Sequence, residues 1–143
     1  MVRQAYLSDV DLIAPRRQDS AELWAGYRVT PRQALIGGIE NSDASFFTIN
    51  GKPGGVFGCT DHGSLGVPWA IFTATIEKHP REFLRACRGP VEAMKAKHSQ
   101  LMNYVDARNE KVKAWLQFMG FTLLPAEPFG VDQLPFHRFE WHV

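Results

Sequence analysis

The stretch NYVDARNEKVKAWLQFMGF, residues 103–121, indicates the fold of this chain more clearly than any other segment. Its opening residues are apolar and β-prone, a short polar turn follows, and the rest places apolar residues at helical spacing before a Gly-Phe pair. We therefore expect a buried strand at Leu101–Val105, a helix at Asn109–Met119 and another strand at Phe121–Leu124. Such a unit belongs either to an ordinary α/β core or to the wall of a cofactor site, and only the neighbouring elements can separate the two.

The composition predicts one globular domain spanning residues 1–143, because 45% of the residues are hydrophobic and 22% are charged. The 16 Lys and Arg residues nearly balance the 15 Asp and Glu residues, so the net charge of +1 gives no reason to expect a nucleic-acid partner. The 2 cysteines are too few for a disulfide framework, and we recognise neither a signal peptide nor a membrane span. We therefore expect a cytoplasmic protein, or one that leaves the cell by a route that needs no signal peptide.

A β-hairpin is the clearest local signal before that stretch. Ser45–Ile49 and Val56–Cys59 flank Asn50-Gly51, a dipeptide that favours tight turns between antiparallel strands. Pro68–Ile76 is nearly apolar throughout, which predicts a central strand covered on both faces. Residues 80–98 show the apolar spacing of an amphipathic helix.

Shorter elements complete the predicted order. They are a strand at Val2–Tyr6, a helix capped by Ser8 or Asp9 and stopped by Pro15, a helix capped by Asp19 or Ser20 and ended near Gly26, a helix begun by a capping box at Thr30–Gln33, a kink or restart at Pro90, and a closing strand at Phe136–Val143 after a loop at 125–135. This order predicts an α/β (mixed α+β) fold, in which a mixed and mostly antiparallel central sheet carries helices on both faces.

This order resembles the GNAT fold of the Gcn5-related N-acetyltransferases. In that family a strand, an Asn and a helix ending in Gly-Phe are common, and Asn109 precedes Gly120-Phe121 at the usual spacing. Arg16/Arg17, Asp19 and Glu22 are similar to an Arg-x-x-Asp-x-x-Glu pattern often found before the second GNAT helix.

A narrower resemblance is to the GNAT-like small internal virion proteins of T7-like bacteriophages. It rests on Asn103-Tyr104-Val105, on Asn109 with its apolar helix, and on the final Phe139-Glu140-Trp141. This resemblance implies a phage-encoded protein in the host cytoplasm or the virion interior, with a host–virus interaction as its setting.

The GNAT resemblance implies acetyl-CoA, or coenzyme A, as cofactor and an amine, for example that of a host protein, as acceptor of the acetyl group. It implies that the backbone of the central strand pairs with the pantetheine arm, while basic side chains and an Asn contact the rest of the cofactor. The implied cofactor-binding residues are Phe72, Thr73, Ala74, Lys78, Arg81 and Asn109.

Two departures from the family pattern bear on catalysis. Glu77–Leu84 contains no glycine, although GNAT enzymes place a glycine-rich pyrophosphate loop there. Leu116 stands where many of them carry a Tyr that acts as general acid, and a leucine cannot donate a proton. Tyr104 is the candidate replacement acid, while His62 or Asp61, and also Glu22, are the candidate general bases.

Each candidate also has a structural interpretation. Asn109 can simply cap its helix, and the Arg81, Arg85 and Arg88 stripe can be a solvated helix face. Cys59–His62 fits a strand end better than a metal site, because no second pair of ligands follows at useful spacing. The 4 tryptophans are expected as core or sheet-surface anchors.

Two functional hypotheses follow. The first is a GNAT-type acetyltransferase. The second is a non-catalytic GNAT scaffold that serves as an internal virion, assembly or host-protein-binding protein, with Pro125–His142 and its aromatic side chains as the partner surface. A helix N-terminus plugged by Phe83 or Glu82 would favour the second, because it would exclude a pyrophosphate.

Overall fold

The computed structural model describes residues 1–143, and an 8-stranded sheet in the order β1-β2-β3-β4-β5-β8-β6, with β7 paired to β8, lies at its centre. Its strands are β1 (Val2–Gln4), β2 (Asp43–Ile49), β3 (Lys52–His62), β4 (Leu65–Phe72), β5 (Gln100–Asp106), β6 (Thr122–Leu123), β7 (Glu127–Phe129) and β8 (Leu134–His142). All neighbouring strands are antiparallel except β4 and β5, which are parallel.

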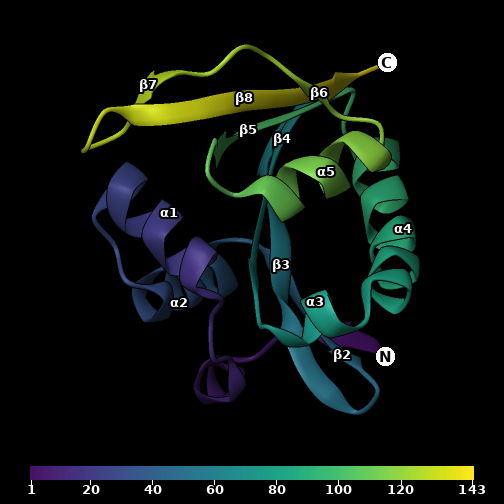
Figure 1. Ribbon diagram of the computed structural model, residues 1–143. Coiled ribbons are helices and arrows are strands. Elements are labelled where there is room, and N and C mark those ends of the chain that lie inside the picture. Colours follow the sequence, from purple (N-terminus) through teal and green to yellow (C-terminus); the bar gives the residue numbers. More distant parts are fainter.

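Helices cover both faces of this sheet (Figure 1). One face carries α1 (Arg17–Tyr27) and α2 (Pro31–Asn41), and the other carries α3 (Thr75–Lys78), α4 (Pro80–Lys97) and α5 (Glu110–Phe118), with the 3-10 helix η1 (Leu7–Leu12) before α1. The predicted mixed, mostly antiparallel sheet with helices on both faces is confirmed. No helix is long and apolar enough to cross a membrane.

The local predictions for the hairpin and for the start of α2 are confirmed. Ile49 pairs with Lys52 across the Asn50-Gly51 turn, whose φ angles of 53° and 73° suit a type I′ turn. At the start of α2, the Thr30 hydroxyl accepts the Gln33 N–H at 3.2 Å, and the Gln33 side chain accepts the Thr30 N–H at 2.9 Å. This is the predicted capping box.

The predicted strand Pro68–Ile76 was too long. β4 ends at Phe72, and Thr75–Lys78 forms α3. The Thr73 hydroxyl donates to the Pro53 carbonyl at 2.7 Å and accepts the Thr75 N–H at 3.3 Å. Because this side chain satisfies local backbone groups, it turns the chain out of the sheet despite the apolar residues that follow.

The predicted caps of the first helices were also wrong. The N-cap residues are Tyr6 for η1 and Arg16 for α1, while Asp9 and Asp19 lie inside the first turns. The Asp9 carboxylate accepts the Tyr6 N–H at 2.8 Å from that position. Two further expectations fail in part, because the loop at 125–135 contains β7 and α4 continues through Pro90 without a restart.

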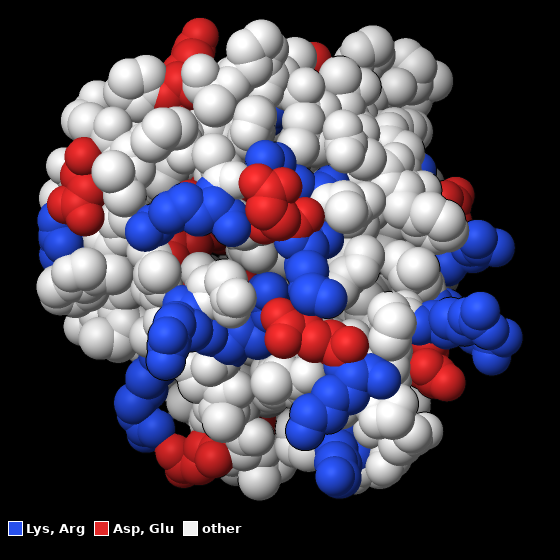
Figure 2. All heavy atoms as spheres, viewed as in Figure 1, with Lys and Arg blue, Asp and Glu red and all other residues white.

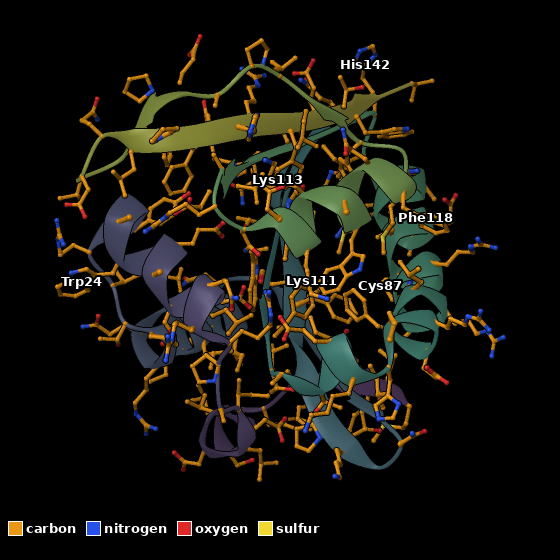
Figure 3. All side chains as sticks on the ribbon, viewed as in Figure 1. Trp24, Cys87, Lys111, Lys113, Phe118 and His142 are labelled. Atoms are coloured by element: carbon orange, nitrogen blue, oxygen red, sulfur yellow. The ribbon has the colours of Figure 1, made fainter.

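Aromatic residues of the C-terminal segment do not form an exposed partner surface. Phe136 and Phe139 are only 1% and 6% exposed. Trp24, in contrast, is 49% exposed and is not a core anchor; it points away from the sheet on the outer side of α1 (Figure 3). Charges of both signs are interspersed on the face shown in Figure 2, as the net charge of +1 suggests.

The one parallel pairing opens the sheet. β4 and β5 pair only at their starts, through Leu65 with Gln100 and Gly66 with Leu101. The Asn103 side chain then donates to the Pro68 carbonyl at 2.7 Å, and beyond that link the strands diverge. This divergence places the candidate site at the centre of the molecule.

Candidate active site

A cavity of about 560 Å³ occupies the divergence of β4 and β5. Residues from both faces of the sheet line it, so it passes through the sheet. On the α1/α2 side the lining includes Glu22, Leu23, Tyr27, Val29, Ala34 and Trp69, and on the α4/α5 side it includes Phe83, Cys87, Val91, Met94, Trp115 and Leu116. Its size and mostly apolar walls are typical of small-molecule sites.

The edge of β4 presents backbone groups to this cavity. The Phe72 N–H donates to the Asp19 carboxylate at 2.8 Å, and the Phe72 carbonyl accepts the Arg16 N–H at 2.9 Å, so both groups are satisfied by the chain entering α1. The N–H and C=O groups of successive residues in a strand point to alternate edges, so those of Ala70 point to the same edge of β4 as those of Phe72. Ala70 pairs with Phe57 of β3 only across a non-hydrogen-bonded position, and β5 has already diverged. Ala70 therefore offers the open backbone position of this edge.

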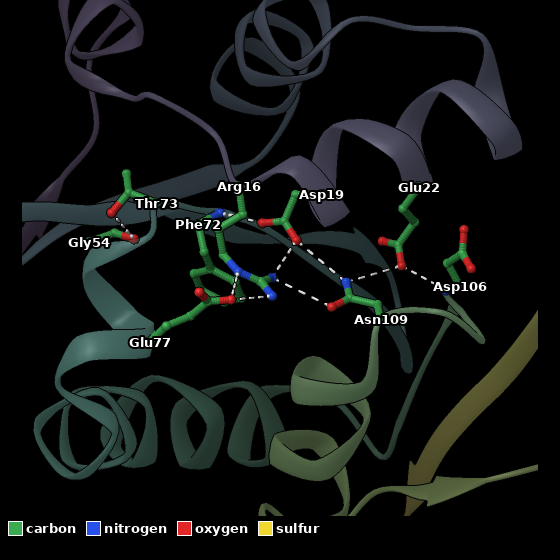
Figure 4. Close-up of polar contacts among 9 residues, drawn as sticks. All are labelled: Arg16, Asp19, Glu22, Gly54, Phe72, Thr73, Glu77, Asp106 and Asn109. Atoms are coloured by element: carbon green, nitrogen blue, oxygen red, sulfur yellow. Dashed lines mark hydrogen bonds and ion pairs between the residues drawn. The ribbon is translucent and has the colours of Figure 1, made fainter.

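A buried ion-pair network closes the end of the divergence (Figure 4). The Arg16 guanidinium donates to the Asp19 carboxylate at 2.9 Å and to Glu77 of α3 at 3.0 Å. Asn109 completes the network, with its amide within 3.4 Å of Asp19 and 3.5 Å of Glu22. Since Arg16, Asp19 and Asn109 are all buried, the charges are compensated by one another rather than by water.

Asn109 thus does not cap α5 with its side chain. It occupies the N-cap position but makes no side-chain capping bond. Its side chain turns to α1, where it also lies 3.5 Å from Arg16. The capping interpretation is therefore wrong, and the residue joins α5 to the Arg16 network.

The Glu22 carboxyl group is the clearest candidate for proton transfer. Its Oε1 accepts the Asp106 N–H at 2.7 Å and lies 3.5 Å from the Asn109 amide, while Oε2 has no protein partner. Burial and then the neighbouring charges of Asp19 and Asp106 raise the pKa of Glu22 to about 7, although the Asp106 N–H opposes the shift. A carboxyl group with this pKa can accept a proton near neutral pH.

The remaining candidate residues lie as follows. Tyr104 lines the cavity on the α1 side of β5, with its ring stacked on Phe129 at 4.1 Å. Ala74, Lys78 and Arg81 are exposed around α3 and the start of α4, while Thr73 is buried and bonded to Pro53. His62 pairs with Leu65 at the opposite end of β4, roughly 23 Å from Phe72 at ~3.3 Å per residue. The structure brings Glu22, Tyr104, Phe72 and Asn109 together and leaves His62 apart.

Phe83 does not protrude into the opening of the α4 N-terminus. It is 1% exposed and packs under α4 against Phe72 and Trp115, with ring centroids 5.0 Å and 4.3 Å away. Glu82 is exposed. Cys87 lines the same wall, and burial raises the pKa of its thiol to about 12, so this cysteine stays protonated and is a poor nucleophile.

Two features of the site were not predicted from the sequence. Arg16 was noticed only within a pattern, yet it links α1, α3 and α5. Ala70, rather than Phe72, carries the open backbone groups. The spacing of Arg16, Asp19 and Glu22, each three residues apart, was the available signal, because residues three apart share a helix face.

Solved structures of other proteins share this fold over nearly its whole length. An aminoglycoside N(6′)-acetyltransferase from Legionella pneumophila has a TM-score of 0.75 at 8% identity, covering 99% of this chain and 91% of that chain. A ribosomal-protein-alanine N-acetyltransferase from Brucella melitensis has a TM-score of 0.70 at 14% identity, covering 100% and 99%. The yncA protein from Salmonella typhimurium, solved with its cofactor acetyl-CoA, has a TM-score of 0.68 at 13% identity, covering 99% and 92%.

These likenesses first define a class of architecture, the mixed α+β fold of acetyltransferases. More particularly, the chain has the GNAT fold that residues 103–121 predicted. No known family model and no curated protein matches the sequence.

Proposed function

We propose that the protein is a GNAT-type N-acetyltransferase that transfers the acetyl group of acetyl-CoA to an amine. The observation that carries this proposal is the cavity through the sheet, which is lined both by the open backbone of Ala70 and by the Glu22 carboxyl group. Such a passage suits a transferase that uses a ternary complex, because two substrates that enter from opposite faces of the sheet can meet in it.

The chain's own groups suit the amide-bearing arm of the cofactor well and its diphosphate less well. The Ala70 N–H and carbonyl can pair with an amide-bearing arm as an added strand would, and Lys78 and Arg81 supply positive charge for a diphosphate. The segment Glu77–Leu84 still lacks glycine, so close backbone contact with the diphosphate is restricted. When bound, acetyl-CoA supplies an activated thioester.

The reaction then requires only proton transfer and orientation from the protein. The amine nitrogen forms a bond to the acetyl carbonyl carbon as the carbon–sulfur bond breaks, and the Glu22 carboxylate takes the proton that the nitrogen loses. The sulfur leaves as a thiolate, which is a fair leaving group and can be protonated by water or by the Tyr104 hydroxyl. The lack of an acid at position 116 therefore does not prevent the reaction, since orientation and electrostatic stabilisation supply much of the rate enhancement.

Calorimetric titration with acetyl-CoA tests this proposal. We expect micromolar binding that weakens severalfold in Arg81→Ala and changes little in Arg85→Ala, the matched control one turn further along the exposed face of α4. Absence of both heat and thermal shift at millimolar acetyl-CoA would overturn it.

A second function is favoured by a specific observation. Both backbone groups of Phe72 are held by Arg16 and Asp19, as expected if β4 no longer needs that position for a cofactor. On this alternative the protein is a non-catalytic GNAT scaffold that acts inside a phage particle or binds a host protein. The phage origin rests on the sequence resemblance of residues 103–109 and 139–141, and failure of the acetyl-CoA titration would make this the working proposal.

A further inference from the structure

Trp69 is held rigidly on the α1/α2 side of the cavity. Its indole N–H donates to the Ser42 hydroxyl at 3.0 Å, and that hydroxyl donates to the Gly38 carbonyl at 2.7 Å. The ring lies between two glycines, because a Cβ added at Gly38 or Gly58 would come within 2.4 Å or 2.8 Å of it. One serine and two glycines therefore hold the Trp69 ring in place, and Trp69 lines the cavity.

The surroundings of Trp69 are mostly apolar, and the hydroxyl groups on this side of the cavity belong to Thr60, Tyr27 and Tyr104. Leu23, Val29, Ala34 and Val67 line the same side of the cavity. Glu22 and Asp19 are the two carboxylic acids of the lining, and Glu22 Oε2 has no protein partner. A ligand that fits this half must combine an apolar body with a group that can donate hydrogen bonds to a carboxylate.

We infer that the acceptor is a small primary amine with an aromatic body, which lies against Trp69 while its amino group reaches Glu22. This inference rests on the proposed function and names its acceptor class. An aromatic ring packed against a fixed indole buries apolar area, with little loss of side-chain entropy because the indole is already ordered. A polyamine or a sugar amine would instead place polar groups against Leu23, Val29 and Val67, which cannot form hydrogen bonds with them through their side chains.

Two tryptophans report separately on the two halves of the cavity. Trp69 lines the α1/α2 side, and Trp115 lines the α4/α5 side against Phe83 and Phe72. The indole N–H signals of these residues, assigned by Trp→Phe substitution in a ¹⁵N-labelled protein, distinguish acceptor binding from cofactor binding. The readout requires no catalytic turnover.

The test is a titration of the wild-type protein with phenethylamine, with spermidine as the polar comparison, followed by a separate titration with acetyl-CoA. We expect phenethylamine to shift the Trp69 signal and spermidine to leave it unchanged, while acetyl-CoA shifts that of Trp115. If acetyl-CoA shifts Trp115 and phenethylamine does not shift Trp69 at millimolar concentration, or if spermidine shifts Trp69 equally, the acceptor class is wrong and the transferase proposal stands. If neither ligand shifts its tryptophan, both fail.

Neighbouring glycines of α2 provide a matched pair of variants. Gly38→Ala must displace the Trp69 ring, whereas a Cβ at Gly37 meets nothing within 4 Å. We expect Gly38→Ala to weaken phenethylamine binding by about tenfold or more and Gly37→Ala by less than about twofold, with acetyl-CoA binding the same in both. Equal phenethylamine affinity in the two variants would contradict the role of the fixed ring.

Discussion

Ala70 and Phe72 lie two residues apart on the same edge of β4, yet the molecule uses them differently. Phe72 gives its N–H to Asp19 and its carbonyl to the Arg16 N–H, so this position ties α1 to the sheet. Ala70 points the same way into the cavity and has neither β5 nor α1 to pair with. The difference shows how a fold can stabilise a split sheet at one backbone position and leave the adjacent one open to a ligand.

Removing the Asp19 carboxylate takes away the acceptor of the Phe72 N–H and should have the largest of the expected effects on the stability of the protein. Asp19→Ala leaves the Phe72 N–H without its acceptor and leaves the buried Arg16 with only Glu77 as an ionic partner. We expect a loss of about 3–5 kcal/mol in the free energy of unfolding, measured with urea. Asp11→Ala removes an exposed ion pair to Arg32 and should cost at most about 1 kcal/mol. Similar losses in the two variants would show that the buried network does not hold α1 to β4.

Filling the open backbone position at Ala70 should weaken ligand binding strongly, with a smaller effect on stability. The Ala70 side chain is exposed and lines the cavity, so Ala70→Trp can place its ring there without opening the core. We expect acetyl-CoA affinity to fall by about 100-fold or more by calorimetry, which corresponds to about 2.7 kcal/mol. Ala96→Trp, at an exposed position of α4 outside the cavity, is the control. Unchanged affinity in Ala70→Trp would place the cofactor elsewhere.

Glu22→Gln tests the chemistry of the open site, because it removes the proton acceptor while keeping the shape of the cavity. Since the carboxylate is the active form and its pKa is about 7, wild-type kcat/KM for thiol release with phenethylamine, calculated on the concentration of neutral amine, should rise with pH up to about 7 and then level. The variant should be slower by about 100-fold above that pH and should lack this rise. A variant that keeps the same pH profile would exclude Glu22 as the base.

The same substitution makes a smaller prediction about stability. The folded pKa of Glu22 is raised above its ordinary value, so its contribution is fully present below the unfolded pKa and is lost as pH rises through about 7. Glu22→Gln does not titrate, so it should gain on the order of 1–2 kcal/mol relative to wild type between about pH 5 and pH 8, allowing for solvent screening. Urea unfolding at both pH values measures this difference. Exposed Glu82→Gln should show no such trend, and an equal trend there would refute the assignment to Glu22.

The sequence predicted the parts of the fold that depend on nearby residues. The Asn50-Gly51 turn and the Thr30 capping box are formed by residues adjacent or three apart, and both are present. The end of β4 was misplaced because Thr73 bonds to Pro53, 20 residues away. Apolar spacing alone does not contain such a contact.

The candidate site shows the same limit. Glu22 and Asn109 were identified through a family resemblance, and the structure places them together. The pairing of Arg16 with Glu77, 61 residues apart, and the Ser42–Trp69 contact, 27 residues apart, follow from how α1, α2 and the sheet pack. His62, in contrast, has suitable chemistry for a base but pairs with Leu65 at the end of β4 that lies far from the site.

The most direct test of the open and occupied positions is amide hydrogen exchange of Ala70 and Phe72, followed by NMR with and without acetyl-CoA. The free protein should protect the Phe72 amide, which donates to Asp19, and exchange the Ala70 amide rapidly. Acetyl-CoA should then protect Ala70 and leave Phe72 unchanged. Equal protection of the two amides in the free protein, or no gain at Ala70 with millimolar acetyl-CoA, would contradict the assignment of Ala70 as the backbone position that receives the cofactor.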